Sequence, residues 1–297
     1  MPRKFTRVYD KLTLAFAAAT ALGLTTGASA QTLSCVALPT DTPAVRDNSV
    51  TERVGDLRII CVGGTPTAAG APVPRFNLQI FTSPAVTITS RILGGDVSEA
   101  LLLMDEPDAS AQTICGSAST PADSTASGTC GLLGTGNGIG TYSGAPKNGA
   151  IPGRPNAFIG RRVGETSIVV NGIPFDPPGG GPARVMRLTN IRLNASQLNN
   201  IRGGAMAVNL IISTTSSGLA HSIQIPIGNP APTVGITQTA MDFSASGATF
   251  LQCESQNYSG NSLASPVAPQ LSLKFTERYP SAFRRRSAAI PVSPDAV

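Results

Sequence analysis

Short runs of alternating apolar and polar residues, separated by glycine, proline and asparagine, are the feature that most limits what this chain can fold into. The densest group lies in residues 158–212, which hold four such runs. Alternation with a period of two is typical of half-buried strands, and no stretch shows the roughly 3.6-residue apolar period of an amphipathic helix. We therefore expect an all-β fold of the immunoglobulin-like β-sandwich type, as one large sandwich or two small ones.

The expected strands follow one another along most of the chain. They cover residues 54–62, 76–81, 86–93, 100–104, 157–163, 168–172, 186–193, 205–213, 222–227, 233–238, 248–253 and 271–275. A change of phase at Thr189-Asn190 indicates a β-bulge. Residues 195–198 are expected to form one helical turn, and residues 176–182 (DPPGGGP) a turn that fixes the strand register.

Residues 1–30 have the pattern of a secretory signal peptide. Four basic residues precede an apolar stretch at 12–24. Ala28-Ser29-Ala30 forms a cleavage signal that would leave Gln31 as the first mature residue. A lipoprotein alternative depends on Cys35, but Thr32 stands where a lipidation signal has leucine. We expect an exported protein, secreted or at the cell surface, with no membrane span after the signal is removed.

The rest of the chain divides by composition. We expect an N-terminal β unit in residues 31–106, a Gly/Ser/Pro-rich loop in 107–155, a C-terminal β unit packed with the first in 156–277, and a disordered tail in 278–297. A loop as long as 107–155 is unusual inside a compact domain, and it is either a boundary between two β units or a long excursion. Without residues 1–30 the chain keeps 18 basic and 16 acidic residues, which gives no broad basic face for a nucleic-acid partner.

Five cysteines lie in the expected mature part, where export permits disulfides. The economical pairing joins Cys35 to Cys61 and Cys115 to Cys130, and leaves Cys253 free or intermolecular. Other pairings stay open, because the sequence alone does not choose among them.

Several motifs resemble, in the same order, an uncharacterised family of secreted β-rich proteins found mainly in acidobacteria-type soil bacteria. They are residues 52–66 (ERVGDLRIICVGGTP), 98–107 (SEALLLMDEP), 154–160 (RPNAFIG), 173–179 (IPFDPPG) and 184–198 (RVMRLTNIRLNASQL). The resemblance implies a secreted β-rich protein and transfers no known activity, cofactor or catalytic residue. Members of that family often continue past the position of residues 275–286, so a truncated version of a longer protein is one interpretation of this chain.

The sequence offers little for catalysis. His221 is the only histidine and no G-x-S-x-G motif is present, so we predict no catalytic residues and no cofactor. Asp105 and Glu106 are adjacent, and adjacent residues on a strand point to opposite faces, so they are not expected to act as a catalytic pair. Together with Asp108 they are weak candidates for a calcium site, and the alternative is a charged turn before Pro107.

We therefore predict a non-catalytic structural or adhesive protein of the cell surface or extracellular matrix, whose partners are surface or matrix components or a second copy. The first alternative is a polysaccharide-binding module, including a calcium-assisted one, although the expected mature chain has no Trp and only three Tyr. A hydrolase is less favoured. Polymerisation through open sheet edges is a further hypothesis.

Overall fold

The computed structural model describes residues 31–115, 130–146, 148, 153–198, 204–218, 221–246 and 272–278. The predicted signal peptide, the expected strand at 248–253, Cys253 and nearly all of the expected C-terminal tail lie outside these described residues. Within the described part of the chain, no helix is long and apolar enough to cross a membrane.

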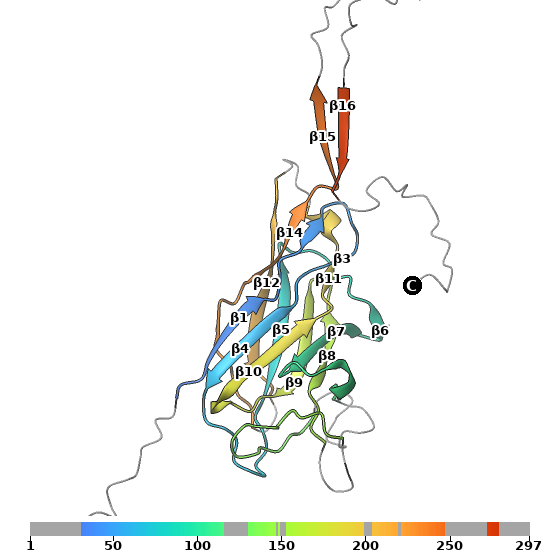
Figure 1. Ribbon diagram of the computed structural model, residues 1–297. Coiled ribbons are helices and arrows are strands. Elements are labelled where there is room, and N and C mark those ends of the chain that lie inside the picture. Colours follow the sequence, from blue (N-terminus) through green and yellow to red (C-terminus); the bar gives the residue numbers. More distant parts are fainter. Residues whose placement is uncertain are drawn as a thin grey trace, which may run out of the picture.

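The body is all-β and consists of one large curled sheet (Figure 1). Its strands are β1 (Ser34–Pro39), β2 (Ala44–Arg46), β4 (Leu57–Gly63), β5 (Arg75–Ser83), β6 (Ile92–Gly94), β7 (Val97–Met104), β8 (Ala157–Val163), β9 (Ser167–Pro174), β10 (Gly179–Thr189), β12 (Ala207–Ser216), β13 (Ile227–Gly228) and β14 (Thr233–Gln238). They lie in the order β13-β1-β4-β10-β7-β8-β9-β5-β12-β14-β2, with β6 beside β7. The sheet is mixed, because β1 and β13, and β14 and β2, pair in parallel while the other neighbours are antiparallel.

Two smaller pairs and two short helical turns complete the described fold. The pairs are β3 (Glu52–Arg53) with β11 (Arg192–Leu193), and β15 (Met241–Ser246) with β16 (Ser272–Glu277). The turns are η1 (Ala109–Ala111) and η2 (Ala195–Gln197). The turn η2 confirms the helical turn expected there, and Asn194 stabilises it by accepting the Ser196 N–H at 3.2 Å.

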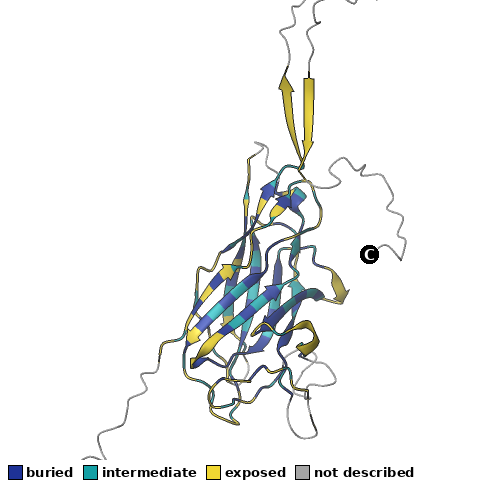
Figure 2. Cartoon of the chain, viewed as in Figure 1, coloured by how far each residue is buried: buried dark blue, intermediate teal, exposed yellow. Residues whose placement is uncertain are grey.

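The core lies on the inner face of the curled sheet, where β1, β4 and β10 lie in front of β5 and β12 (Figure 1). Inward side chains form rows across neighbouring strands, and Figure 2 shows the resulting alternation of buried and exposed positions. One such row joins four strands and is fully buried: Ala37, Ile59, Met186 and Met104. The disulfide between Cys35 and Cys61 joins directly opposite residues of β1 and β4 on the same inner face.

Residues 221–229 form a strap that links β12 to β1. The Thr214 hydroxyl of β12 donates to the Ile225 carbonyl at 2.6 Å, and the Asn229 amide donates to the Ala37 carbonyl of β1 at 2.9 Å. Only Ile227–Gly228 within the strap pairs as a strand, so the strand expected at 222–227 is wrong over most of its length. Its buried residue Ile225 covers the core between β12 and β1.

Two other expectations from the sequence need correction in detail. The immunoglobulin-like sandwich is not confirmed. Strands from residues 31–106 lie between strands from residues 156–277 in one continuous curled sheet. In residues 86–93 the expected alternation is present, with Val86, Ile88 and Ser90 buried, but only an isolated bridge and the short strand β6 form there. The segment is therefore extended without being a ladder strand.

The pair β15–β16 projects from the body as a two-stranded ribbon (Figure 1). Every described residue of both strands is exposed, as in the short strand β6 and in contrast with the long strands of the body. The ribbon is therefore held by its own hydrogen bonds and by the Phe243–Phe275 contact, whose ring centroids are 5.2 Å apart.

Because the body is buried and the ribbon is exposed, a Phe→Ala substitution should lower the free energy of unfolding more in the body than in the ribbon. Phe76 is fully buried and packs edge-on against Phe175, so Phe76→Ala should lower the free energy of unfolding by about 3–5 kcal/mol. Phe243→Ala, at a side chain that is 60 % exposed, should change it by less than about 1 kcal/mol. Urea unfolding of both variants measures the difference, and equal losses would contradict the assignment of the core.

Candidate functional site

A cavity of about 370 Å³ lies beside the first residues of β10, and we call it the rim cavity. Its walls come from four separate parts of the chain: Arg58 of β4, Asp105 and Glu106 directly after β7, loop residues 137–140, and residues 178–185 at the start of β10. Because these parts are far apart in sequence, the curled sheet is what brings them together.

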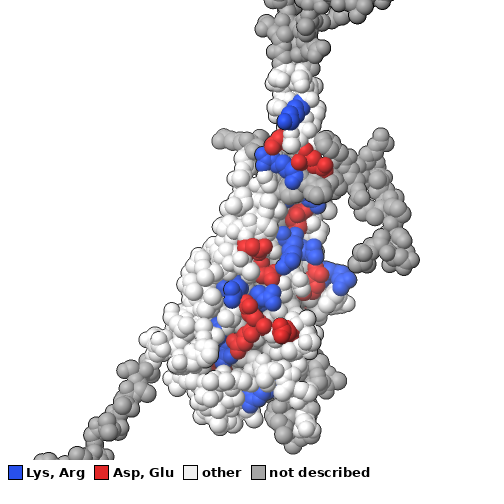
Figure 3. All heavy atoms as spheres, viewed as in Figure 1, with Lys and Arg blue, Asp and Glu red and all other residues white. Residues whose placement is uncertain are grey.

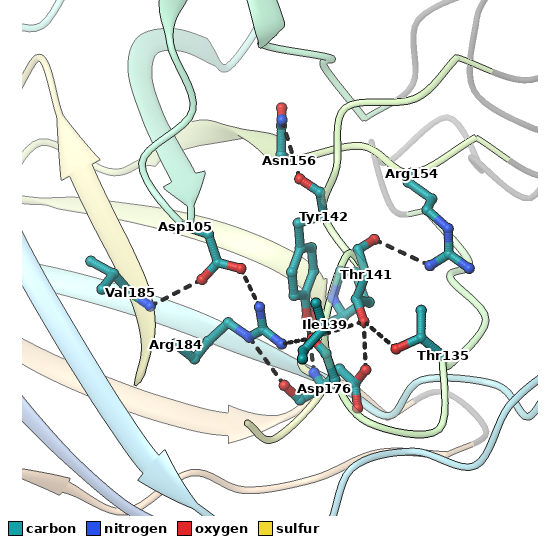
Figure 4. Close-up of polar contacts among 12 residues, drawn as sticks. Asp105, Thr135, Ile139, Thr141, Tyr142, Arg154, Asn156, Asp176, Arg184 and Val185 are labelled. Carbon is teal, nitrogen blue, oxygen red and sulfur yellow. Dashed lines mark hydrogen bonds and ion pairs between the residues drawn. The ribbon is translucent and has the colours of Figure 1, made fainter. Parts of the chain in front are cut away.

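Arg184 is the buried centre of the wall of this cavity (Figure 4). Its side chain points to the inner face of β10, like that of the buried Met186 two residues later. The Arg184 side chain is only 5 % exposed. Its guanidinium donates to the Asp105 carboxylate, to the Asp176 carbonyl at 3.1 Å and to the Gly138 carbonyl at 2.6 Å. These contacts from three segments compensate for the loss of water around a buried charge.

The glycine at position 138 is required by this contact. Its φ is +73°, in the left-handed region, and an added Cβ would lie 2.8 Å from the Pro177 carbonyl oxygen. Any other residue would therefore push the loop away from Arg184. Gly138 belongs to the Gly/Ser/Pro-rich loop predicted at 107–155, and its carbonyl is an acceptor for the buried arginine near the start of β10.

Asp176 is a fully buried carboxylate that fixes two loops. One oxygen accepts the Thr67 backbone N–H at 2.7 Å, and the other accepts the Thr141 hydroxyl at 2.6 Å. Residues 176–182 were expected to act only as a turn. Instead β10 begins at Gly179, which pairs with Gly63, and its register shifts before Arg184.

Tyr142 lies between these groups and packs its ring 4.6 Å from the Arg184 guanidinium carbon. Its hydroxyl donates to the Pro174 carbonyl and accepts the Asp176 N–H, both at 2.8 Å. Burial raises the pKa of the Tyr142 hydroxyl well above its usual value, although the Arg184 charge acts in the opposite direction. The hydroxyl is thus un-ionised near neutral pH, and its two internal hydrogen bonds give it a structural role.

The described residues of the loop predicted at 107–155, which we call the excursion, are fastened to the body. The predicted disulfide between Cys115 and Cys130 is present within it. Asn156 donates to the Ala111 carbonyl at 3.0 Å and accepts the Thr113 N–H at 2.8 Å, which holds the segment before the disulfide. Residues 137–140 of the excursion form one wall of the rim cavity.

Asp105 and Glu106 both face arginines at the rim cavity. Their φ angles are +59° and +48°, so two consecutive residues leave the extended conformation after β7. The expectation that they point to opposite faces of a strand is therefore wrong. Glu106 forms an ion pair with Arg58 at 2.8 Å, and Asp105 pairs with Arg184.

The predicted calcium candidates are not gathered around one point. Asp108 begins the turn η1 without a side-chain capping bond. Among the described residues, no group of three or more His, Cys, Asp or Glu side chains is placed to hold a metal ion. His221, the only histidine in the sequence, is exposed in a turn with a φ of +59°.

Acidic and basic side chains alternate in a stripe along the face of the molecule seen in Figure 3. Ion pairs among the described residues include Arg187–Asp56 at 3.1 Å, Arg192–Glu99 at 3.0 Å and Arg161–Asp96 at 2.5 Å. The two signs are interleaved, so this face presents no broad field of one sign.

Sequence reasoning missed Arg184, Tyr142 and Asp176 as members of one site. Each belongs to a segment without a catalytic or binding motif. Arg184 and Asp176 are 8 residues apart, but the contacts that bring in Tyr142 and Asp105 cross 34 and 79 residues of sequence. The only available signal was the presence of charged residues beside the Gly/Pro turn, and that pattern is common in exposed loops. No family model matches this sequence, and no curated protein matches it.

The Asp176 network predicts a stability loss when its charge is removed. In Asp176→Asn one acceptor oxygen becomes a donor that faces the Thr67 N–H or the Thr141 hydroxyl, which should lower the free energy of unfolding by about 1–3 kcal/mol. Asp96→Asn is the matched control, because Asp96 is 53 % exposed in its ion pair with Arg161 and should cost at most about 1 kcal/mol. Equal midpoints of urea unfolding for the two variants would contradict the structural role.

Tyr142 predicts a loss of stability at high pH. Its folded pKa is raised above the unfolded value, so its contribution is complete below pH of about 10 and decreases as the pH rises further, because the unfolded chain ionises first. The excess stability of the natural protein over Tyr142→Phe should therefore shrink above that pH, by at most about 1.4 kcal/mol per pH unit. Urea unfolding across this pH range measures it, and a constant difference would disprove the linkage.

Proposed function

We propose that this is an exported, non-catalytic protein of the cell surface or extracellular matrix, with a structural or adhesive role. Support for an extracytoplasmic location comes from the two disulfides, which persist in oxidising compartments, and from the pattern of residues 1–30. Support for a non-catalytic role comes from the rim cavity, where both carboxylates are paired with arginines and the tyrosine hydroxyl is held neutral.

The observation that carries the structural role is the chemistry of the β15–β16 ribbon. Directly opposite residues share a face, so one face holds five apolar side chains and Glu277, and the other holds only polar ones. The apolar residues are Met241, Phe243, Ala245, Leu273 and Phe275. The four larger ones are 39 to 60 % exposed. An isolated two-stranded ribbon is marginal in water, so an uncovered apolar face is stabilised when something packs on it.

The occupant that we propose is a second copy of this chain. The outer face of β1 and β4 carries a matching apolar patch, defined here as Val36, Leu38, Ile60 and Val62. Val36, Leu38 and Val62 are 39, 42 and 44 % exposed. A chain that carries both a projecting apolar ribbon and an apolar patch elsewhere on its surface can associate head to tail, which builds open chains of subunits.

Self-association should depend on the apolar face of the ribbon. The natural protein should show a mass that rises with concentration in sedimentation equilibrium, and Phe243→Ser with Phe275→Ser should weaken the association at least tenfold. The matched control changes the polar face, as Ser244→Thr with Thr276→Ser, and should associate like the natural protein. A natural protein that stays monomeric at every concentration contradicts the proposal.

A complementation experiment tests the head-to-tail arrangement itself. A patch variant, Val36→Asp with Val62→Asp, should also fail to associate alone. Mixed with the ribbon variant it should form one-to-one dimers, because one partner supplies the ribbon and the other the patch. If the mixture stays monomeric although both variants are folded by circular dichroism, the patch is not the acceptor.

A further inference from the structure

The rim cavity has a balanced set of charges. Arg184 pairs with Asp105, and Arg58 pairs with Glu106 at 2.8 Å, so two cations and two anions line the same opening. To pair with one of the arginines, an anionic ligand would have to displace the carboxylate that already pairs with it. To pair with one of the carboxylates, a cationic ligand would have to displace its arginine. A neutral ligand needs neither exchange, so charge alone favours an uncharged molecule.

The outer of the two ion pairs keeps hydrogen-bonding capacity for such a ligand. The Arg58 and Glu106 side chains are 36 and 38 % exposed at the cavity. A guanidinium has five N–H donors and a carboxylate has about four acceptor positions, so one contact between them leaves both donors and acceptors available. Adjacent donors and acceptors are what neighbouring hydroxyl groups need, since each hydroxyl both donates and accepts.

The position of these groups is fixed before a ligand arrives. The left-handed backbone at Asp105 and Glu106 turns both carboxylates toward the cavity, and the Val185 N–H donates to the Asp105 carboxylate at 3.2 Å. Arg184, buried beneath, is held by the Asp176 and Gly138 carbonyls. Such preorganisation reduces the entropy that binding would otherwise cost.

The remaining wall is apolar. Ile139 is 59 % exposed where the excursion borders the cavity, and Pro178, Pro182 and Val185 line the side formed by the start of β10. Figure 4 shows Ile139 in front of the polar network. Aliphatic and proline side chains can cover the C–H surface of a sugar ring, so the cavity combines an apolar wall with paired polar groups.

We propose that the rim cavity binds a neutral saccharide, with Arg58 and Glu106 bonding to neighbouring hydroxyls and Ile139 covering the ring. The volume of about 370 Å³ lies within the range of about 300–1,000 Å³ that is usual for small-ligand sites. This site is separate from the ribbon, and it gives an adhesive surface protein a carbohydrate partner.

The experiment is a glycan array that carries neutral and uronic-acid oligosaccharides, probed with the full exported chain in the presence and absence of EDTA. We expect binding to neutral saccharides that EDTA does not change. The array is repeated with the ribbon variant, Phe243→Ser with Phe275→Ser, so that loss of self-association and loss of saccharide binding are read separately. Hits confined to acidic saccharides, hits abolished by EDTA, or no hits at all would overturn the proposal.

Two matched variants locate the binding. Glu106→Gln should weaken the best neutral ligand at least tenfold by calorimetry, because it removes the carboxylate that we propose to bond to the saccharide hydroxyls. Glu99→Gln, which alters the Glu99–Arg192 ion pair outside the cavity, should leave the affinity unchanged. Thermal unfolding confirms that both variants are folded, and an affinity that Glu106→Gln does not change would place the saccharide elsewhere and overturn the assignment.

Discussion

The inner face of the large sheet has to be kept away from water, and the rest of the structure depends on how this is achieved. Leu57, Leu188, Leu102 and Phe158 form a buried row across β4, β10, β7 and β8, and a flat sheet would leave such rows open on one side. Curling brings β5 and β12 opposite these strands, and the strap at 221–229 links β12 to β1. Only two residues of the strap pair as a strand, and its buried residue Ile225 packs into the core.

The same requirement explains the polar network at the rim. Arg184 occupies an inward position of β10 where the body ends, so its charge lies at the limit of the apolar core. The buried charge is stable only with acceptors from several segments, and the Gly138 loop, the Asp176 turn and Asp105 supply them. The network therefore fastens the excursion to the sheet and, as a consequence, forms the walls of a cavity.

The alternation of apolar and polar residues predicted many of the strands, but it did not predict which strands lie side by side in the sheet. The strands at 157–163 and 233–238 agree with the sequence at both ends, because alternation with a period of two is a property of the strand itself. The pairing of β9 with β5 and of β10 with β7 could not be predicted, because it joins residues far apart in sequence. At the site, the sequence singled out Asp105 and Glu106, but it did not predict their left-handed backbone. The contacts among Asp176, Tyr142 and Arg184 also arise only in the folded chain.

The ribbon and the body use one sequence pattern with different outcomes. Alternation in β5 buries Phe76, whereas alternation in β15 leaves Phe243 exposed, because within the described part of the chain no second layer covers the ribbon. The difference lies in what packs on each strand rather than in the strand, and the second copy that we propose would cover the ribbon as the curl covers the body. The acceptor patch borders the rim cavity, because its Leu38 pairs with Arg58 and its Ile60 pairs with Val185, and both partners line the cavity. In the proposed head-to-tail assembly, a ribbon that packs on the patch therefore lies beside the cavity of the next copy, so we expect assembly and saccharide binding to influence each other.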